Sequence, residues 1–424
     1  MTAPAEESGA SAAESGSPEA NARHGSYLPV LFFACAILIV STGARSSFGL
    51  FLPEMTAARG WSRETFSLAI AFQNLVWGIS GTFLGAMADK YGAARTLVLG
   101  ALLYVAGFLG MAWAQSGVEL ALSAGLLIGV AIGGTSFGII LALLGRLVPE
   151  EKRSLAFGIG VASASFGQFL FVPLAGRMIA SFGWQPTLWM HAGVVALIVL
   201  FALALGRREG RHSDGGNLQI GAALRTAIGD RSFHLLFWGY LVCGMQVVFI
   251  ALHLPAYLTD RGLDAGVGGT ALALIGLFNI VGSLGAGVLG QRLSKKRVLT
   301  TIYLARSAVI SLFLLVPLSP VSVYVFSAAM GVLWLSTVPL TNALVGQIYG
   351  VRTLGTLGGV VFVGHQLGSF LGAWAGGRIF DVTGSYNWAW GLIIAFGLFA
   401  AVIHAPINEL ALSRRGAAAP SGQG

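Results

Sequence analysis

Long apolar runs, separated by short polar breaks, fill almost the whole chain. Each run is long enough to cross the ~30 Å hydrocarbon core of a bilayer as an α-helix. The runs are continuous and do not alternate between apolar and polar residues, which excludes a transmembrane β-barrel. Read against Gly, Pro and charged residues, they predict twelve helical spans, near residues 28–52, 66–88, 96–114, 119–145, 155–176, 186–206, 233–258, 267–290, 298–318, 321–346, 354–377 and 387–406.

The longest break between spans divides them into two sets of six. We therefore expect six-helix bundles over residues 27–206 and 233–406, joined by a cytoplasmic linker at 207–232. Residues 1–26 are mainly Ala, Ser, Glu and Gly without an apolar core, which predicts a disordered cytoplasmic tail, and 407–424 form a second tail. The first apolar run is longer than the core of a signal peptide, so we expect it to remain as a helix.

Two pairs of similar segments indicate an internal repeat. The segment "GAMADKYGAAR" (85–95) aligns with "GVLGQRLSKKR" (287–297), and "GRMIASFGWQPTLW" (176–189) aligns with "GRIFDVTGSYNWAW" (377–390) at nearly the same offset. A six-helix unit duplicated in parallel is the architecture of transporters whose two halves rock about a central site. The pattern predicts an all-α polytopic membrane protein with two pseudo-symmetric six-helix halves.

Composition and charge agree with a membrane protein. Hydrophobic residues make up 55% of the chain and charged residues 10%, against about 25% charged in soluble proteins. Most of the 25 Lys and Arg residues fall on one side of the predicted spans, so the positive-inside rule predicts that both termini are cytoplasmic. The resemblance given below implies that the membrane is the inner membrane of a bacterium. The net charge of +8 then reflects topology and contact with lipid, and we expect no nucleic-acid partner.

Arg45 lies within the first predicted span. A charge at mid-bilayer costs from ~3 to more than 10 kcal/mol, so it normally faces a wet cavity. All 17 acidic residues fall in tails, loops or helix ends, so none is placed to neutralise it. Because the guanidinium stays charged and its planar fork fits a carboxylate, Arg45 is a candidate ligand for an anionic substrate. The alternative is that it snorkels to the interface or bonds helix carbonyls.

Neutral polar side chains at membrane depth are further candidates for substrate binding. Each is a possible ligand for a carboxylate, hydroxyl or keto oxygen, and each could equally hold helices together. These residues are Gln73, Asn74, Gln168, Asn279, Asn342 and Gln366.

The histidines are the candidates for proton coupling, because no acid is predicted within the spans. His365, near mid-depth of the eleventh span, is the first candidate for coupling and also for substrate binding, with a packing role as the alternative. His253, at the outer end of the seventh span, is the second. We expect structural roles for His191 and His404, and the same is favoured for Arg306 in the ninth span.

The segment "GAMADKYGAAR" resembles the loop between helices 2 and 3 of the major facilitator superfamily, Gly-x-x-x-Asp-[Arg/Lys]-x-Gly-x-x-[Arg/Lys]. The resemblance implies that charged residues latch the cytoplasmic ends of the two halves together, the alternative being that they only mark the membrane edge. In the second copy Gln291 replaces the acid, so a weaker latch is expected there. The predicted latch consists of Asp89, Lys90, Arg95, Arg292 and Arg297.

Three segments are similar to the monocarboxylate transporter and oxalate:formate antiporter branch of that superfamily, namely "ARSSFGLFLPEM" (44–55), "KRSLAFGIGVASASFG" (152–167) and "HQLGSFLGAWAGGRIFDVTGSYNWAWG" (365–391). Monocarboxylate transporters carry a lysine at the position of Arg45. Asn279 and Ser283 stand where their eighth helix carries Asp and Arg. His365 or Gln366 stands where the antiporters carry a lysine. The family's charged machinery is thus mostly replaced, which leaves the coupling ion open.

Together these features predict a secondary transporter that moves small organic anions, above all monocarboxylates, by alternating access, with Arg45 as counter-charge. Protons or a counter-anion are the candidate co-substrates. The alternative is an efflux pump for drugs or metabolites, although the fifth span lacks the Gly-Pro-Gly-Gly arrangement of drug/proton antiporters. The spans hold no converging acids or His/Cys cluster, so we expect no enzymatic activity, cofactor or metal. A receptor with a transporter fold would bind a ligand without moving it.

Overall fold

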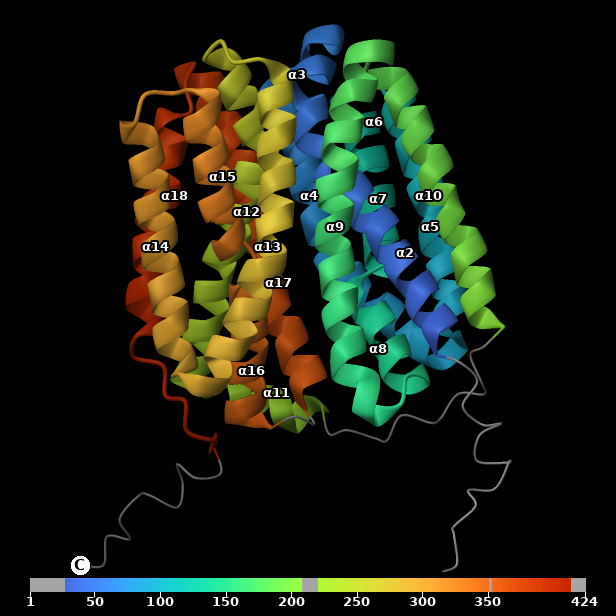
Figure 1. The fold of residues 1–424 in the computed structure, drawn as a ribbon, viewed down its shortest axis with the longest axis vertical. Coiled ribbons are helices and arrows are strands. Elements are labelled where there is room, and N and C mark those ends of the chain that lie inside the picture. The colour runs from blue at the N-terminus through green and yellow to red at the C-terminus, as the bar shows by residue number, and fades with distance from the viewer. Residues whose placement is uncertain (1–26, 208–219, 351–352, 413–424) are drawn as a thin grey trace, which may run out of the picture.

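The computed structural model describes residues 27–207, 220–350 and 353–412, which fold into helices joined by short connections with no β-strand in these ranges (Figure 1). The helices of the first half are α2 Leu28–Ser46, α3 Phe48–Arg59, α4 Arg63–Tyr91, α5 Ala93–Trp113, α6 Gly117–Leu120, η1 Ala121–Leu127, α7 Ile128–Gly134, α8 Phe137–Leu147, α9 Glu150–Phe182 and α10 Trp184–Gly206. Those of the linker and second half are α11 Ile220–Ile228, α12 Arg231–Asp260, α13 Ala265–Arg292, α14 Lys295–Leu315, α15 Pro320–Leu333, α16 Thr337–Tyr349, α17 Leu354–Thr383 and α18 Asn387–His404.

The helices form two bundles that stand side by side, the first half in blue and green and the second in yellow to red (Figure 1). Among the described residues, eleven stretches are long and apolar enough to cross a membrane, and α17, with 30 residues, is the twelfth helix of the two sets of six. Between the halves α4 packs on α17, α9 on α13 and α3 on α12. The predicted class, an all-α membrane protein with twelve helices in two halves, is confirmed.

The two ends of the bundle differ in what they carry. One end holds α11 and both ends of the described chain, and we call it the near end (Figure 1). The opposite, far end holds the turns at 60–62, 261–264 and 384–386. The predicted tail 1–26 lies outside the described residues. Within the predicted linker 207–232, residues 208–219 also lie outside them.

Far-end helix boundaries have the chemistry that such boundaries need. Ser62 caps α4 by accepting the Thr65 N–H, and Asp264 caps α13 by accepting the Gly266 N–H. Gly60 and Gly384 end α3 and α17 in the left-handed conformation, with φ of 67° and 68°, which glycine adopts without a Cβ clash. These caps satisfy backbone groups where the helices leave the apolar layer.

Three of the twelve spans are not single α-helices, which the apolar pattern does not predict. The first is interrupted at Ser47 and continues to Arg59, past the predicted end at residue 52. The fourth contains the π-helical turn η1 and breaks at 135–136. The tenth breaks at 334–336, the pseudo-symmetric position. Backbone groups freed at such breaks must be satisfied by other helices, because lipid offers no partner.

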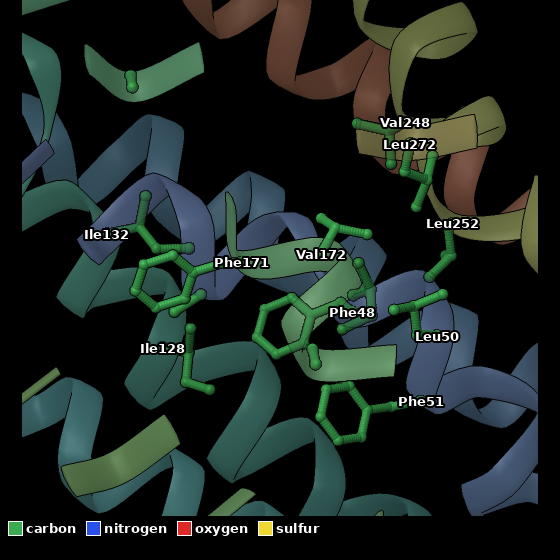
Figure 2. Packing of buried hydrophobic residues seen from close by; sticks show 14 of the residues in the cluster. Phe48, Leu50, Phe51, Ile128, Ile132, Phe171, Val172, Val248, Leu252 and Leu272 are labelled. Carbon is green, nitrogen blue, oxygen red and sulfur yellow. The ribbon is translucent and has the colours of Figure 1, made fainter. Parts of the chain in front are cut away.

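A shared apolar core joins the two halves. One cluster of buried side chains includes Phe48 and Phe51 of α3 together with Val248 and Leu252 of α12 and Leu272 of α13, and Figure 2 shows these residues among others of the cluster. A second, smaller cluster belongs to the second half alone. The junction of the halves beside α3 is therefore a packed apolar contact that also borders the site described next.

Candidate functional site

Arg45 lies in the last turn of α2, beside the interruption of the first span. Ser47 stabilises this interruption: its hydroxyl donates to the Ala44 carbonyl at 2.8 Å and lies 3.1 Å from His191 Nε2 of α10. His191 is buried and its Nδ1 lies 2.8 Å from the Thr187 carbonyl. The histidine thus fixes the backbone next to Arg45 and does not reach the cavity.

The guanidinium of Arg45 is partly buried and incompletely bonded. Its Nη2 donates to Asn74 Oδ1 of α4 at 2.9 Å, and its Cζ lies 4.7 Å from the centre of the Trp77 ring. Its Nε is buried without a hydrogen-bond partner. Ion pairs in the described part of the chain join Arg63 to Asp260 and Arg378 to Glu64, and none involves Arg45. A cation with a spare donor in an apolar layer has the chemistry to bind an anion, so Arg45 stays a candidate ligand.

Arg45 borders a cavity of about 70 Å³ between the two halves. This is well below the 300–1,000 Å³ typical of sites for drug-sized ligands. The wall is mostly apolar, with a few polar groups and one charge. Its residues are Arg45, Ser46, Phe48, Gly49, Ile70, Gln73, Gln168, Val247, Val248, Ala251, Leu252, Leu272 and Trp334.

Gln73 is a second polar group on the cavity wall. Its Nε2 donates at 2.6 Å to the Ala124 carbonyl, which belongs to the π-helical turn η1. Turns of this kind leave carbonyls without their usual helical donor, and they occur at functional sites. The Gln73 Oε1 is buried without a partner, so it remains available as a hydrogen-bond acceptor beside the cavity.

A chain of hydrogen bonds runs from Arg45 to His365 in the other half. Asn74 accepts from Arg45 with its side chain, and its backbone carbonyl accepts from Gln366 Nε2 at 3.1 Å. Gln366 Oε1 lies 3.0 Å from His365 Nδ1, while His365 Nε2 is buried without a partner. His365 also packs on Tyr240, with ring centres 4.8 Å apart. The predicted coupling candidate is thus linked to Arg45 through two amides and does not contact it.

The remaining predicted ligands lie in different environments. Gln168 lines the cavity, and its Nε2 donates to the Leu272 carbonyl of α13 at 2.8 Å. Asn279 is buried and bonds neighbouring segments, donating to Ser165 and accepting from the Leu335 N–H. Asn342 is exposed, donates within its own helix to Val338, and does not line the cavity.

Trp334 reaches the cavity wall because the tenth span breaks there, and two residues of other helices hold the break. Arg306 of α14, which is fully buried, donates to the carbonyls of Leu333 and Trp334. On the other side, Asn279 accepts the Leu335 N–H at 3.0 Å. Arg306 therefore bonds helix carbonyls, the arrangement considered as an alternative for Arg45. A lone arginine in the ninth span gave no signal of which carbonyls it would bond.

A network of charged residues joins the two halves at the far end. Arg63 of α4 forms two bonds of 2.6 Å to the carboxylate of Asp260 of α12. Asp381 of α17 accepts the backbone N–H groups of Arg63 and Glu64, and Glu64 pairs with Arg378 at 3.0 Å. Sequence reasoning missed this network, whose signal was the placement of acids and bases at the far ends of three spans.

His253 adjoins the far-end network through a tyrosine. Its Nδ1 lies 3.2 Å from the Tyr386 hydroxyl, which accepts from Arg63 at 3.0 Å, and its Nε2 lies 2.9 Å from the Ala373 carbonyl. Both ring nitrogens thus have partners, in contrast to His365. The predicted position at the outer end of the seventh span agrees with this placement, and its role in proton coupling stays a prediction.

The cations of the predicted latch lie at the near end, and the latch stays a prediction. Lys90, Arg95, Arg292 and Arg297 are exposed, and none forms an ion pair with a described residue. The side chain of Asp89 lies outside what the structure describes. Within the described chain, the ion pairs that join the halves are at the far end, so this conformation is closed at that end.

Comparison with known proteins places the chain among transporters. The sequence profile of the Major Facilitator Superfamily matches residues 34–373 and 236–418. Relatives include the uncharacterized MFS-type transporter YcxA of Bacillus subtilis (27% identical, 88% of this chain and 93% of that protein) and monocarboxylate transporter 13 of Bos taurus (26%, 84% and 82%). Multidrug resistance protein MdtH of Cronobacter sakazakii is 28% identical over 85% and 90%. The crystal structure of a point mutant of the nucleoside transporter NupG superposes with a TM-score of 0.74, at 12% identity, over 89% and 99%.

Proposed function

The chain belongs to the major facilitator superfamily, and from this premise we propose that it is a secondary transporter of small organic anions, with monocarboxylates as its expected substrates. The observation that carries the proposal is Arg45, a cation without a described carboxylate partner on the wall of a cavity between the halves. Similarity to monocarboxylate transporter 13 supports the same class of substrate.

Arg45 and its neighbours suit one carboxylate and one further oxygen. The unpartnered Nε–H can donate to one carboxylate oxygen, and Nη2, which uses one of its two N–H groups for Asn74, has a second that can donate to the carboxylate. Asn74 and Trp77 hold the guanidinium from α4, so the donors are ordered before the anion arrives. The free Gln73 Oε1 can accept a hydrogen bond from a hydroxyl of the substrate. A cavity of about 70 Å³ suits short acids.

Alternating access then consists of exchange between this conformation and one that opens at the far end. Opening requires the Arg63–Asp260 and Glu64–Arg378 pairs to separate, while the near-end cations approach the opposite half. We propose that the near end is cytoplasmic, as the positive-inside rule predicts. Labelling of single cysteines at Val382 and Leu293, both exposed, with an impermeant maleimide on intact cells would test this: reaction at Leu293 alone contradicts it.

Uptake into liposomes tests the substrate and the site together. Short monocarboxylates and oxalate are presented to the protein, to Arg45→Gln and to Arg45→Lys, with Arg177→Gln as the matched control, since Arg177 is exposed on α9. Loss of two charge-assisted hydrogen bonds predicts a fall of about 10²-fold or more in uptake efficiency for Arg45→Gln. Arg45→Lys keeps the charge and loses the planar fork, so its uptake efficiency should lie between those of Arg45→Gln and the unaltered protein. Equal uptake by Arg45→Gln and the control contradicts the proposal.

Coupling is tested in the same liposomes by an inward proton gradient and by preloaded anion. Stimulation by the gradient that is lost in His365→Gln, with exchange of preloaded anion retained, supports a proton path through His365. Loss of the stimulation in His253→Gln but not in His365→Gln supports instead a proton path through the far end. Acceleration by preloaded anion without any effect of the gradient supports anion exchange.

Efflux of drugs is the second candidate function, and the similarity to multidrug resistance protein MdtH favours it. A lone arginine on the cavity wall repels lipophilic cations, so the anion proposal predicts no protection of cells against them. Resistance to such compounds on overexpression, abolished by Trp334→Ala and not by Arg45→Gln, supports efflux and contradicts the anion site.

A further inference from the structure

Two glutamines form equivalent hydrogen bonds across the interface between the halves. Gln366 of α17 donates its Nε2 to the Asn74 carbonyl of α4 at 3.1 Å. Gln168 of α9 donates its Nε2 to the Leu272 carbonyl of α13 at 2.8 Å. In each case the fifth long helix of one half bonds the backbone of the second long helix of the other half.

The two bonds have the same internal spacing in corresponding pairs of helices, about one helical turn out of register with the aligned segments, which are 201 to 202 positions apart. The glutamines, the accepting residues and the facing glycines are each separated by 198 positions (366 − 168, 272 − 74 and 276 − 78). A Cβ on Gly78 would lie 2.9 Å from Gln366 Cγ, and a Cβ on Gly276 would lie 2.9 Å from Gln168 Cγ. The same three-residue arrangement thus occurs twice, once between α4 and α17 and once between α9 and α13.

The position of the glycine explains how the bond forms. In an α-helix the N–H of residue i bonds the carbonyl of residue i−4, so Gly78 and Gly276 are the residues whose N–H groups face the Asn74 and Leu272 carbonyls. A carbonyl has two lone pairs, and the second is reached from the side of the helix. Because glycine has no Cβ, the glutamine stem can lie against the helix at that level and place its amide on the free lone pair.

Both contacts lie at the level of the central cavity. Gln168 and Leu272 line it, and Asn74 holds Arg45. The ion pairs between the halves lie at the far end, towards Arg63, about 16 Å along α4 from Asn74 at 1.5 Å per residue. The four near-end cations named above form no ion pair with a described residue.

We infer that the two glutamine contacts, Gln366 with Asn74 and Gly78 and Gln168 with Leu272 and Gly276, are the pivot about which the halves rock. Two contact points define a line, and rotation about that line leaves both in place while separating other contacts in proportion to their distance from it. Gln168 and Gln366 are then positioning residues, whose amide N–H groups bond the backbone of the opposite half. The inference rests on the alternating access proposed above. It states in addition which contacts stay formed while the halves exchange between conformations.

Disulfide pairs with matched geometry test the pivot. A Cβ at Gly276 would lie 3.0 Å from Gln168 Cβ, and one at Gly78 would lie 3.1 Å from Gln366 Cβ, close to the spacing of a disulfide after a small shift. The Gln168→Cys/Gly276→Cys and Gln366→Cys/Gly78→Cys pairs are made in a background without Cys35 and Cys243. The control pair is Ser67→Cys/Gly377→Cys, where the same distance is 2.9 Å but the residues lie nearer the far end.

The readout is opening of the far end, measured in nanodiscs by energy transfer between dyes on Ala58 and Val382, both exposed. The dyes are attached by a chemistry that does not use cysteine. All proteins carry Glu64→Gln and Asp260→Asn, which remove both described ion pairs between the halves and favour opening. Each disulfide is compared with its own reduced form, so a fold defect appears in both.

The pivot predicts that oxidation of the Gln168/Gly276 cysteine pair, of the Gln366/Gly78 pair, or of both leaves the opening rate within about twofold. Oxidation of the control pair should abolish opening. Loss of opening on oxidation of these two pivot pairs, restored by reductant, overturns the inference. A far end that never opens in the background without disulfides contradicts alternating access itself, so the two failures are distinct. The measurement needs no substrate and is independent of the anion site.

Discussion

Arg63 and Asp260 face each other across the two halves at the far end, joined by two bonds of 2.6 Å between guanidinium and carboxylate. Next to them, Asp381 accepts the N–H groups of Arg63 and Glu64 at 3.1 and 2.7 Å. The N-terminus of α4, the positive end of its dipole, is therefore capped by a carboxylate from the opposite half. Closure of the far end satisfies helix-end donors that must find water when it opens.

Asp260→Asn should shift the conformational equilibrium towards an open far end. The pair is partly exposed, with side chains 16% and 31% accessible, so we expect about 1 kcal/mol, or roughly fivefold in population. A single cysteine at Leu252, on the cavity wall, should then react faster with a maleimide added from the far side. Glu54→Gln, exposed on α3, is the control, and equal labelling rates in the two variants contradict the role of the pair.

Asn74→Leu should weaken substrate binding while leaving the pivot. The change removes the Oδ1 that orders Arg45 and keeps the backbone carbonyl that accepts from Gln366. Loss of one hydrogen bond to a charged group, about 1.5–3 kcal/mol, predicts a KM raised at least about tenfold. Asn342→Leu, at an exposed site away from the cavity, should keep its KM. A normal KM in Asn74→Leu means that Arg45 is ordered by Trp77 alone.

Arg306→Gln should destabilise the protein more than it alters substrate affinity. The buried guanidinium bonds two carbonyls at the break of the tenth span, and glutamine cannot reach both, so a buried carbonyl loses its donor at a cost of about 1–3 kcal/mol. Thermal unfolding in detergent, followed by tryptophan fluorescence, should show a lower midpoint than Arg177→Gln. An unchanged midpoint with abolished uptake would instead place Arg306 in transport.

Gly78→Ala and Gly276→Ala should have closely similar effects, because each glycine faces a glutamine stem at the same distance. Each added methyl group would lie 2.9 Å from a glutamine Cγ and push the amide off its carbonyl, an overpacking of about 1–3 kcal/mol. We expect a lower maximal uptake rate with KM unchanged. Gly85→Ala, where a Cβ would meet nothing within 4 Å, should behave as the unaltered protein. An effect in only one of the pair contradicts their equivalence.

The fold could be predicted from the sequence because the bilayer constrains it so strongly. Every span must satisfy its own backbone groups, so an apolar run of sufficient length is a helix. The partners that hold the tenth-span break were hidden because they lie elsewhere in the chain: the carbonyl of Trp334 is satisfied by Arg306, and the N–H of Leu335 by Asn279. Ser336 and Pro339 are local signals of a helix start at this break, but residues 321–346 do not show which groups hold it.

For the candidate site, the sequence identified the polar residues but not the groups to which they hydrogen-bond. Arg45 was predictable, because an arginine without a nearby acid in an apolar run needs an anion or a polar neighbour. Asn74 and Gln366 were predicted as ligands, but an amide can bind substrate or bridge helices equally well. The choice depends on which carbonyl lies within about 3 Å, and that follows from helix packing.

The burial of Arg306 also has a consequence for biogenesis. As α14 enters the bilayer alone, its arginine has no carbonyl to bond, which costs about 3 kcal/mol on insertion scales. The cost is relieved when the break between α15 and α16 brings the carbonyls of Leu333 and Trp334 to it. The ninth and tenth spans should therefore leave the translocon as a hairpin, with the ninth retained there until the tenth has been synthesised.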